Sequence, residues 1–370
     1  MYLDLNDEQK MLAQTVRRFV EKECPSSRVR QIIETEHAYD EQLWAHMAEQ
    51  GWMGLTVSEE YGGLHESWLT VAALFEELGR GVVPGPFLAT VALAAPLLDR
   101  AGNSDQKARW LPAIVEGTCR ATVAYLEEQN SYRYDAPATT ATASGTAFSL
   151  NGSKMFVLDG AVADFTIVSA QLNGELGLFL VEKDAPGLQV ESLESMDLTR
   201  RLARVKLENT PAVALDGAGN AAKALEYALN CAAFALSAES LGGMQWVLET
   251  SVAFAKNREQ YGRLIGSYQA VAHPLADRAL DLNSARSAIY NAADALDHNE
   301  AEATEAASMA KALTGDGYRQ AGYTGIQTHG GIGFTWEHDI QLYFRRASGS
   351  WALFGDPRWH RERMLQAAGI

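Results

Sequence analysis

The chain has 370 residues, of which 47% are hydrophobic, and it carries a formal net charge of −16 at pH 7. This length allows roughly two or three domains around a large core, and the composition is that of an ordinary globular protein. The negative charge argues against nucleic acid or an anionic membrane as the main partner. The longest apolar stretches, such as residues 91–98, are too short to cross a bilayer, so we expect no membrane span.

The N-terminal segment is acidic and amphipathic, without the cationic start and apolar stretch of a signal peptide. The three cysteines, Cys24, Cys119 and Cys231, lie far apart and form no CxxC pair. Structural thiols in a reducing compartment are the simplest interpretation, so we expect a cytoplasmic protein.

Residues 1–118 are predicted to form an N-terminal helical domain. Residues 5–23 repeat apolar side chains at three- and four-residue spacing, and the Asn6/Asp7 pair is placed to cap a helix there. A long apolar stretch further on is interrupted by a turn-forming passage at residues 79–86.

Residues 119–215 differ in composition from the preceding part. They contain many Thr, Val, Ser and Gly residues, in short runs that alternate between apolar and polar side chains. Asn151-Gly152 lies between two such runs and is the dipeptide typical of a tight hairpin turn. Several short strands within this length predict a small barrel or sandwich.

Residues 216–370 return to helical patterns. Three segments are each much longer than the average helix, which favours a bundle of long antiparallel helices.

Two short runs inside this helical region carry the strongest chemical signal. Arg258-Glu259-Gln260-Tyr261-Gly262 is followed, further along the chain, by Gln327-Thr328-His329-Gly330-Gly331-Ile332-Gly333-Phe334. A guanidinium group pairs with a pyrophosphate through a fork of donors, and glycines allow backbone N–H groups to approach the same anion. Taken singly, each run has an ordinary explanation as a solvated arginine or as a glycine-rich helix cap.

Histidines near the second run raise the possibility of a metal site. His329, Glu337 and His338 lie close together in the sequence, but no further ligand has convincing spacing. We therefore expect no metal.

Together, in this order, the two runs resemble the flavin-anchoring motifs of the acyl-CoA dehydrogenase family. In that family the arginine segment of one subunit and the glycine segment of its neighbour grip one FAD. Because FAD and coenzyme A are both anionic, local cations are needed in so acidic a chain. Arg258, Arg263, Arg345 and Arg346 are the expected supply. The resemblance implies FAD contacts from Arg258, Gln260, Tyr261, Gln269, Gln327, Gly330, Gly331 and Gly333.

The resemblance covers essentially the whole chain and implies an α+β, mainly α fold. Its parts are the helical domain at 1–118, a small middle β-barrel or sandwich at 119–215, and a C-terminal four-helix bundle at 216–370. The implied reaction is FAD-dependent α,β-dehydrogenation of an acyl-CoA thioester to a 2-enoyl-CoA, with electrons passed to an electron-transfer flavoprotein. A homo- or hetero-oligomer is implied, such as a dimer of dimers or an α₂β₂ assembly with a homologous chain.

The catalytic base is not at its familiar places. In the family a glutamate removes the α-proton of the thioester, and here Phe354 occupies the usual position and Ala232 the main alternative. Glu239, in a segment similar to that of bacterial two-subunit members acting on bulky or dicarboxylic acyl-CoAs, is the remaining candidate. Its small or apolar neighbours are expected to raise its pKa. A structural acid is the alternative interpretation.

Further departures keep other functions open. The flavin-contacting loop of the family is replaced by 125–132, its Trp-Ile-Thr by Phe156-Val157-Leu158, and an arginine by Ala233. A non-catalytic partner subunit, which completes the site of a homologue, is one alternative. Another flavin reaction on the same fold, such as an oxidase, nitroalkane oxidase or desulfinase reaction, is the other.

Overall fold

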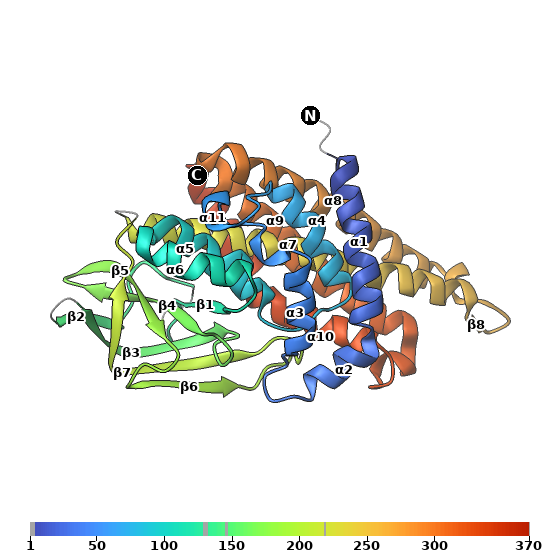
Figure 1. The fold of residues 1–370 in the computed structure, drawn as a ribbon. Helices are drawn as coiled ribbons and strands as arrows, with labels where there is room; N and C mark the ends of the chain where they lie inside the picture. Colours follow the sequence, from blue (N-terminus) through green and yellow to red (C-terminus); the bar gives the residue numbers. More distant parts are fainter. Residues whose placement is uncertain (1–3, 129–131, 145–146, 218–219, 370) are drawn as a thin grey trace.

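The computed structural model describes residues 4–128, 132–144, 147–217 and 220–369. Figure 1 shows an elongated molecule with a β-domain at one end, a long helical bundle that extends to the other, and further helices packed along the bundle. The prediction of a mainly helical α+β fold with three such parts is confirmed.

The N-terminal part consists of helices packed on the bundle. The first one begins as predicted, because the Asn6 side chain accepts a hydrogen bond from the Gln9 N–H and the Gln9 side chain accepts one from the Asn6 N–H. The helices are α1 (Asp7–Glu23), α2 (Ser26–Ile33), α3 (Glu41–Glu49), α4 (Trp68–Arg80), the π-helical segment η3 (Leu88–Ala94), α5 (Ala95–Ala101) and α6 (Ser104–Val115).

The middle part is a small closed barrel. Strand β4 pairs with both β2 and β5, and the ring is completed through β3 and β7, while β1 and β6 extend it at β4 and β7. Its interior is filled by apolar side chains such as Val168, Phe179 and Val205. The strands are β1 (Ala121–Ala124), β2 (Thr140–Ser144), β3 (Ala147–Leu158), β4 (Phe165–Leu172), β5 (Glu175–Glu182), β6 (Leu188–Leu193) and β7 (Leu202–Ala214).

The predicted hairpin turn at Asn151-Gly152 is wrong. Both residues lie inside β3, which stays paired with β7 on either side of a β-bulge at this point. A Cβ at position 152 would lie 2.5 Å from the Thr139 hydroxyl oxygen, so glycine serves the close approach of two chain segments instead of a turn.

The C-terminal part is the predicted bundle of long helices. It comprises α7 (Ala221–Asn257), α8 (Gln269–His298) and α9 (Glu300–His329), with the shorter α10 (Ile340–Ala352) and α11 (Pro357–Ala367) packed on α9. A hairpin of β8 (Glu259–Gln260) and β9 (Arg263–Leu264) links α7 to α8 and projects from the end of the bundle away from the barrel (Figure 1).

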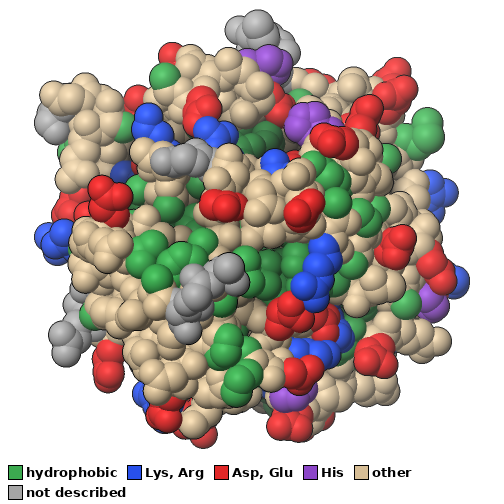
Figure 2. Space-filling view, turned by 60° about the vertical axis from the view of Figure 1, so that its left-hand side comes forward, with side chains coloured by type: hydrophobic (Ala, Val, Ile, Leu, Met, Phe, Trp, Pro, Cys, Tyr) green, Lys and Arg blue, Asp and Glu red, His purple; other side chains and the backbone are tan. Residues whose placement is uncertain are grey.

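Charged side chains of both signs are scattered over the face shown in Figure 2, and apolar side chains gather near its middle. Among the described helices, none combines the length and the apolar character that a membrane span needs.

Candidate functional site

The two motif segments meet in one groove at the end of the bundle. The groove has a volume of about 760 Å³ and lies between the end of α7, the β8–β9 hairpin and the end of α9. Arg258, Gln260 and Tyr261 line it from the first segment, and Gly330 and Gly331 from the second. Five of the predicted FAD-contacting residues therefore share one concave surface.

The directions of the helices explain this meeting. Asn299 alone separates α8 from α9, and a short hairpin joins α7 to α8, so the chain reverses twice. Helices α7 and α9 consequently run in the same direction. Asn230 near the start of α7 donates a 3.0 Å hydrogen bond to Thr304 near the start of α9. At the far ends, the rings of Phe254 and His329 lie 4.5 Å apart. The segment after α7 and the segment at the end of α9 thus reach the same end of the bundle.

This geometry bears on how an FAD site is shared between subunits, which stays a prediction. The family resemblance, as stated above, assigns the arginine segment and the glycine segment to different subunits. In the structure the two segments of a single chain line one groove. Both predicted anchoring segments of one chain therefore border the same concave surface.

The other predicted FAD contacts lie beside the groove. Gln327 lines a neighbouring groove of about 640 Å³, formed by α8, α9 and α10, and Ala270 borders both grooves. Gln269 precedes Ala270 as the first residue of α8. Gly333 is buried, and a Cβ there would lie 2.8 Å from the Ile326 carbonyl oxygen, so its glycine is required by the packing of the turn.

The chemistry of the groove fits the anionic part of FAD. Arg258 is exposed, and no described carboxylate lies within ion-pair distance of its guanidinium. A Cβ built on Gly330 or Gly331 meets no atom within 4 Å, so both residues border open space. The Gly330 N–H is already donated to the carbonyls of Ile326 and Gln327. Arg258 is therefore the residue of the groove best suited to pair with an anion.

Glu239 lies elsewhere, inside a buried ionic cluster near the middle of α7. Arg200, from the β6–β7 connection, donates from Nη2 to both of its carboxylate oxygens at 2.8 and 2.6 Å. Arg346 of α10 donates to the same carboxylate and also pairs with Asp197 at 3.2 Å. The Arg200 Nη1 group further donates to the Ser350 hydroxyl at 3.3 Å. The carboxylate of Glu239 is thus held between two guanidinium groups.

The expectation that the pKa of Glu239 is raised is wrong. Burial alone would raise it, but the positive charges of Arg200 and Arg346 and their hydrogen bonds outweigh burial, so the pKa lies below the ordinary value. A carboxylate that is held ionised by two cations is a poor proton acceptor. Whether Glu239 is the catalytic base stays a prediction, but its surroundings are those of a structural acid.

The same cluster removes one of the arginines that were expected to bind FAD or coenzyme A. Arg346 is buried and engaged with Glu239 and Asp197, so it is not available to FAD or coenzyme A. Arg345 and Arg263 remain near the surface, where their guanidinium groups stack over Trp336 and Tyr268.

A second carboxyl group lies near this cluster. Asp159 is buried, its Oδ2 atom has no hydrogen-bond partner among the described residues, and burial raises its pKa to about 7. Arg200 acts in the opposite direction but does not compensate.

The segment that carries the base in most of the family is held rigidly here. The Nζ of Lys311, a fully buried residue of α9, donates to the carbonyls of Trp351 and Gly355 at 3.2 and 3.0 Å. His360 Nε2 lies 3.1 Å from the Phe354 carbonyl, to which it donates. Phe354 itself is buried with a φ of +60°, so a strained apolar side chain occupies the place of the base.

This segment also contacts the one that replaces the flavin loop of the family. The rings of Tyr132 and Trp359 lie 5.8 Å apart, and Tyr125 and Leu126 are buried in the same core as Phe354. The segment around Phe354 and the segment that replaces the flavin-contacting loop would both border a flavin bound next to this chain's own barrel. In this structure the two segments contact each other.

No metal-ligand set is found in the parts of the chain that the structure describes. His329 and His338 do lie together, with ring centroids 4.4 Å apart, and His329 Nδ1 lies 2.8 Å from the Gly325 carbonyl, to which it donates. Burial lowers the pKa of His329, so its ring is neutral beside the glycine turn.

The three-part fold, with an arginine-bearing groove at the end of its bundle, is the one expected for a flavin-dependent oxidoreductase. Sequence models of the acyl-CoA dehydrogenase N-terminal, middle and C-terminal domains match residues 6–118, 122–209 and 221–368. The chain belongs to the acyl-CoA dehydrogenase family, so its cofactor is FAD and its reaction is the oxidation of an acyl-CoA.

Individual relatives are similar over their full lengths. The acyl-CoA dehydrogenase IpdE2 of Mycobacterium tuberculosis is 34% identical over 355 residues, which cover 95% of this chain and 94% of the relative. A variant of the steroid ACAD Tcur3481-Tcur3483 superposes with a TM-score of 0.90, at 30% identity and 98% coverage of both chains. The ChsE4-ChsE5 complex of Mycobacterium tuberculosis gives a TM-score of 0.91 at 25% identity, with 100% of this chain and 99% of that chain covered.

Proposed function

We propose that this chain is the partner subunit of a heteromeric acyl-CoA dehydrogenase. It supplies the FAD-anchoring groove, and a homologous chain supplies the catalytic base and the barrel that faces the reacting part of the flavin. The observation that carries this proposal is the state of Glu239. The one buried carboxylate proposed as the base is held ionised between Arg200 and Arg346.

The position of the groove supports a shared site. Arg258 follows Glu239 by 19 residues, which is about 28 Å along a helix at 1.5 Å per residue. The barrel lies at one end of the molecule, and the β8–β9 hairpin, which borders the groove, lies at the other (Figure 1). A ligand anchored at Arg258 is therefore remote from this chain's own barrel, which supports a site that a second chain completes.

The chain's own barrel is poorly suited to a flavin. Leu158, buried where family members carry a threonine, has no hydroxyl group, and its carbonyl accepts a 2.6 Å hydrogen bond from Thr122. Phe354 and the contact of Tyr132 with Trp359 fill the region where base and flavin loop would act.

Within the groove each residue has a defined task. Arg258 would pair with the pyrophosphate of FAD, Gly331 would let the ligand approach the backbone, and Tyr261 and Tyr268 would offer aromatic faces. Bound FAD supplies the acceptor for the hydride that leaves the β-carbon of the acyl group. The base on the homologous chain takes the α-proton.

We further propose a bulky acyl-CoA as the substrate and an electron-transfer flavoprotein as the electron acceptor. The likeness to a steroid ACAD supports the first part, and the family resemblance supports the second. We propose that the assembly is an α₂β₂ complex. The structurally similar ChsE4-ChsE5 assembly is itself a complex of two components, which supports a heteromeric arrangement. Three buried, free cysteines are consistent with a reducing compartment such as the cytoplasm.

The test compares the chain purified alone with the chain co-purified with a homologue that carries the usual base. We expect little FAD in the single chain, and full FAD occupancy with dehydrogenase activity in the complex. Arg258→Ala in this chain should weaken FAD binding by about 1.5–3 kcal/mol, the value of a charge-assisted hydrogen bond. Arg358→Ala is the matched control, because Arg358 is exposed and, among the described residues, its ion-pair partner is Glu362 on its own helix.

The opposite result would restore Glu239 as the base. A single chain that holds full FAD, reduces it with substrate and loses that reduction in Glu239→Gln would refute the partner role. Unchanged FAD occupancy in Arg258→Ala would instead refute the groove as the anchoring site while leaving the partner role open to the activity measurement.

A further inference from the structure

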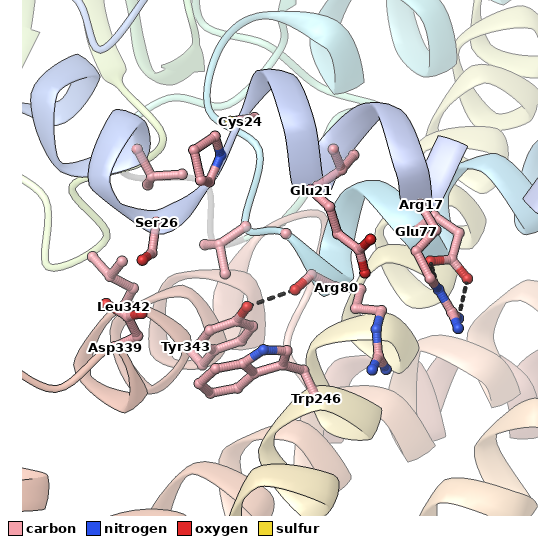
Figure 3. Close-up of a pocket in the computed structure, with 15 residues that line it drawn as sticks. Arg17, Glu21, Cys24, Ser26, Glu77, Arg80, Trp246, Asp339, Leu342 and Tyr343 are labelled. Atoms are coloured by element: carbon pink, nitrogen blue, oxygen red, sulfur yellow. Dashed lines mark hydrogen bonds and ion pairs between the residues drawn. The ribbon is translucent and has the colours of Figure 1, made fainter. Parts of the chain in front are cut away.

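The cavity between the N-terminal helices and the bundle is not selective for a charged ligand. It has a volume of about 250 Å³, and acidic and basic side chains line it together. Figure 3 shows two of them, Arg17 and Glu77, paired with each other at its border. Such a lining favours neither an anion nor a cation. A chemically reactive site lies instead at the surface of the barrel.

The barrel contains both Asn-Gly pairs of the chain, at 151–152 and 173–174. In this dipeptide the asparagine side chain reacts readily with the backbone, because glycine has no Cβ to hinder the approach. The backbone nitrogen of glycine loses its proton and attacks Cγ of asparagine, a C–N bond forms, and the side-chain amide leaves as ammonia. Water then opens the succinimide ring at either carbonyl, which gives aspartate or isoaspartate. The reaction needs no oxidant or reductant.

Asn151 is exposed, but its side chain is held in place. The side-chain N–H donates to Asn209 Oδ1 at 3.2 Å, and Asn151 Oδ1 accepts from the Asn209 N–H at 2.9 Å. Gly152 lies opposite Leu207 in the pairing of β3 with β7. Both the hydrogen bonds and the strand pairing must therefore open before the Gly152 nitrogen reaches the side chain of Asn151.

Asn173 has none of these restraints. Asn173 and Gly174 are both exposed and form the turn between β4 and β5, with φ of +52° and +91°. The pairing of the two strands ends at Leu172 and Glu175, so the Gly174 N–H lies outside it. Among the described residues, none forms a hydrogen bond with the Asn173 side chain, and a Cβ at Gly174 would meet no described atom within 4 Å. The turn therefore has room to adopt the reactive geometry.

We propose that Asn173 is a site of spontaneous deamidation, and that the folded barrel protects Asn151 from the same reaction. Aspartate at this position adds a negative charge next to the exposed Glu175. Isoaspartate also routes the backbone through the β-carbon, which lengthens a two-residue turn by one atom. Because the turn sets the register of β4 and β5, the isoaspartate form should loosen the pairing at Leu172 and Glu175.

The experiment ages the purified full chain at mildly alkaline pH and follows both sites by mass spectrometry after proteolysis. A methyltransferase specific for isoaspartyl carboxylates, supplied with a labelled methyl donor, quantifies the isoaspartate. In the folded chain we expect the reaction at Asn173 to be at least about tenfold faster than at Asn151, which must first lose two hydrogen bonds and its strand pairing. In the chain unfolded by urea the two sites should react at similar rates, since each is then an unrestrained Asn-Gly pair.

Gly174→Asn is the matched variant, because asparagine tolerates the positive φ of the turn while its Cβ hinders the attack. It should slow the reaction at Asn173 and leave Asn151 unchanged. Equal rates at the two sites in the folded chain would overturn the proposal. So would a folded chain that stays unmodified at Asn173 while the unfolded chain reacts there. If the variant fails to fold, the comparison of folded with unfolded chain decides the question. The measurement requires neither FAD nor a second chain, so its outcome is independent of the proposed function.

Discussion

Glu239 contacts guanidinium groups from two other segments of the chain, and these contacts determine what its substitution does. Arg200 comes from the connection between β6 and β7, and Arg346 comes from α10. Its partners are 39 and 107 positions away, so the small and apolar residues next to Glu239 in the sequence give no sign of them. Pattern reasoning therefore identified the buried acid but could not identify the charges that surround it.

Glu239→Gln is expected to destabilise the protein. The substitution leaves two buried arginines short of one negative charge, and breaking a buried ion pair costs about 3–5 kcal/mol. The thermal midpoint should fall clearly, as measured by circular dichroism. Glu259→Gln, in the exposed β8–β9 hairpin, should melt like the unmodified chain. An unaltered midpoint in Glu239→Gln would mean that the carboxylate is free for another task.

Asp159 provides a test of pH dependence. Its pKa is about 7 in the folded chain against 3.8 in the unfolded chain, so the folded state retains a proton that the unfolded state has lost between these values. Stability should therefore fall as pH rises from about 4 to 7 and stay low above 7. Asp159→Asn should raise the unfolding midpoint at pH 8, by an amount equivalent to a few kcal/mol, and change it little at pH 4. Equal effects of the substitution at both pH values would refute this assignment.

At the scale of elements, the long helices and the capped first helix were predictable, because their periodicity is local. The presence of several short strands in the middle part was predictable, but which strands pair with each other was not. The chain contains two Asn-Gly pairs, and only Asn173-Gly174 forms a hairpin turn, with φ of +52° and +91°. The pair at 151–152 is held inside β3 by pairing with β7, a contact that the dipeptide itself does not encode.

The substitution Gly152→Ala tests whether the glycine inside β3 is required for close packing, unlike the glycine of the hairpin turn at 174. The added Cβ would meet the Thr139 side chain at 2.5 and 2.8 Å, so we expect a loss of about 1–3 kcal/mol in unfolding free energy. Gly174→Asn is the control, because its Cβ meets nothing within 4 Å and asparagine tolerates positive φ. Denaturant unfolding of both variants makes the comparison, and equal stability of the two would contradict the close approach at position 152.

At the scale of the molecule, the ionic cluster joins all three parts of the chain. Arg346 of the bundle donates to the carbonyl of Val83 in the N-terminal part and pairs with Asp197 next to the barrel. The groove lies at the C-terminal end of α7, whereas Glu239 lies near its middle, so the ionic cluster and the proposed anchoring groove are separate regions. Because the family resemblance covered the whole chain, this layout was predictable, but the meeting of both motifs within one chain was not.

That meeting depends on two helices of equal size, since α8 and α9 contain 30 residues each. One helix carries the chain away from the hairpin and the other returns it to the same level, at 1.5 Å per residue. An insertion of seven residues in α9 alone would move Gly330 about 10 Å beyond Arg258. We therefore expect insertions and deletions in relatives that retain both motifs to occur in matched pairs, one in each helix. A survey of the lengths of α8 and α9 across such relatives checks this. Length changes in only one of the two helices would show that the two motifs can be separated without loss of FAD binding.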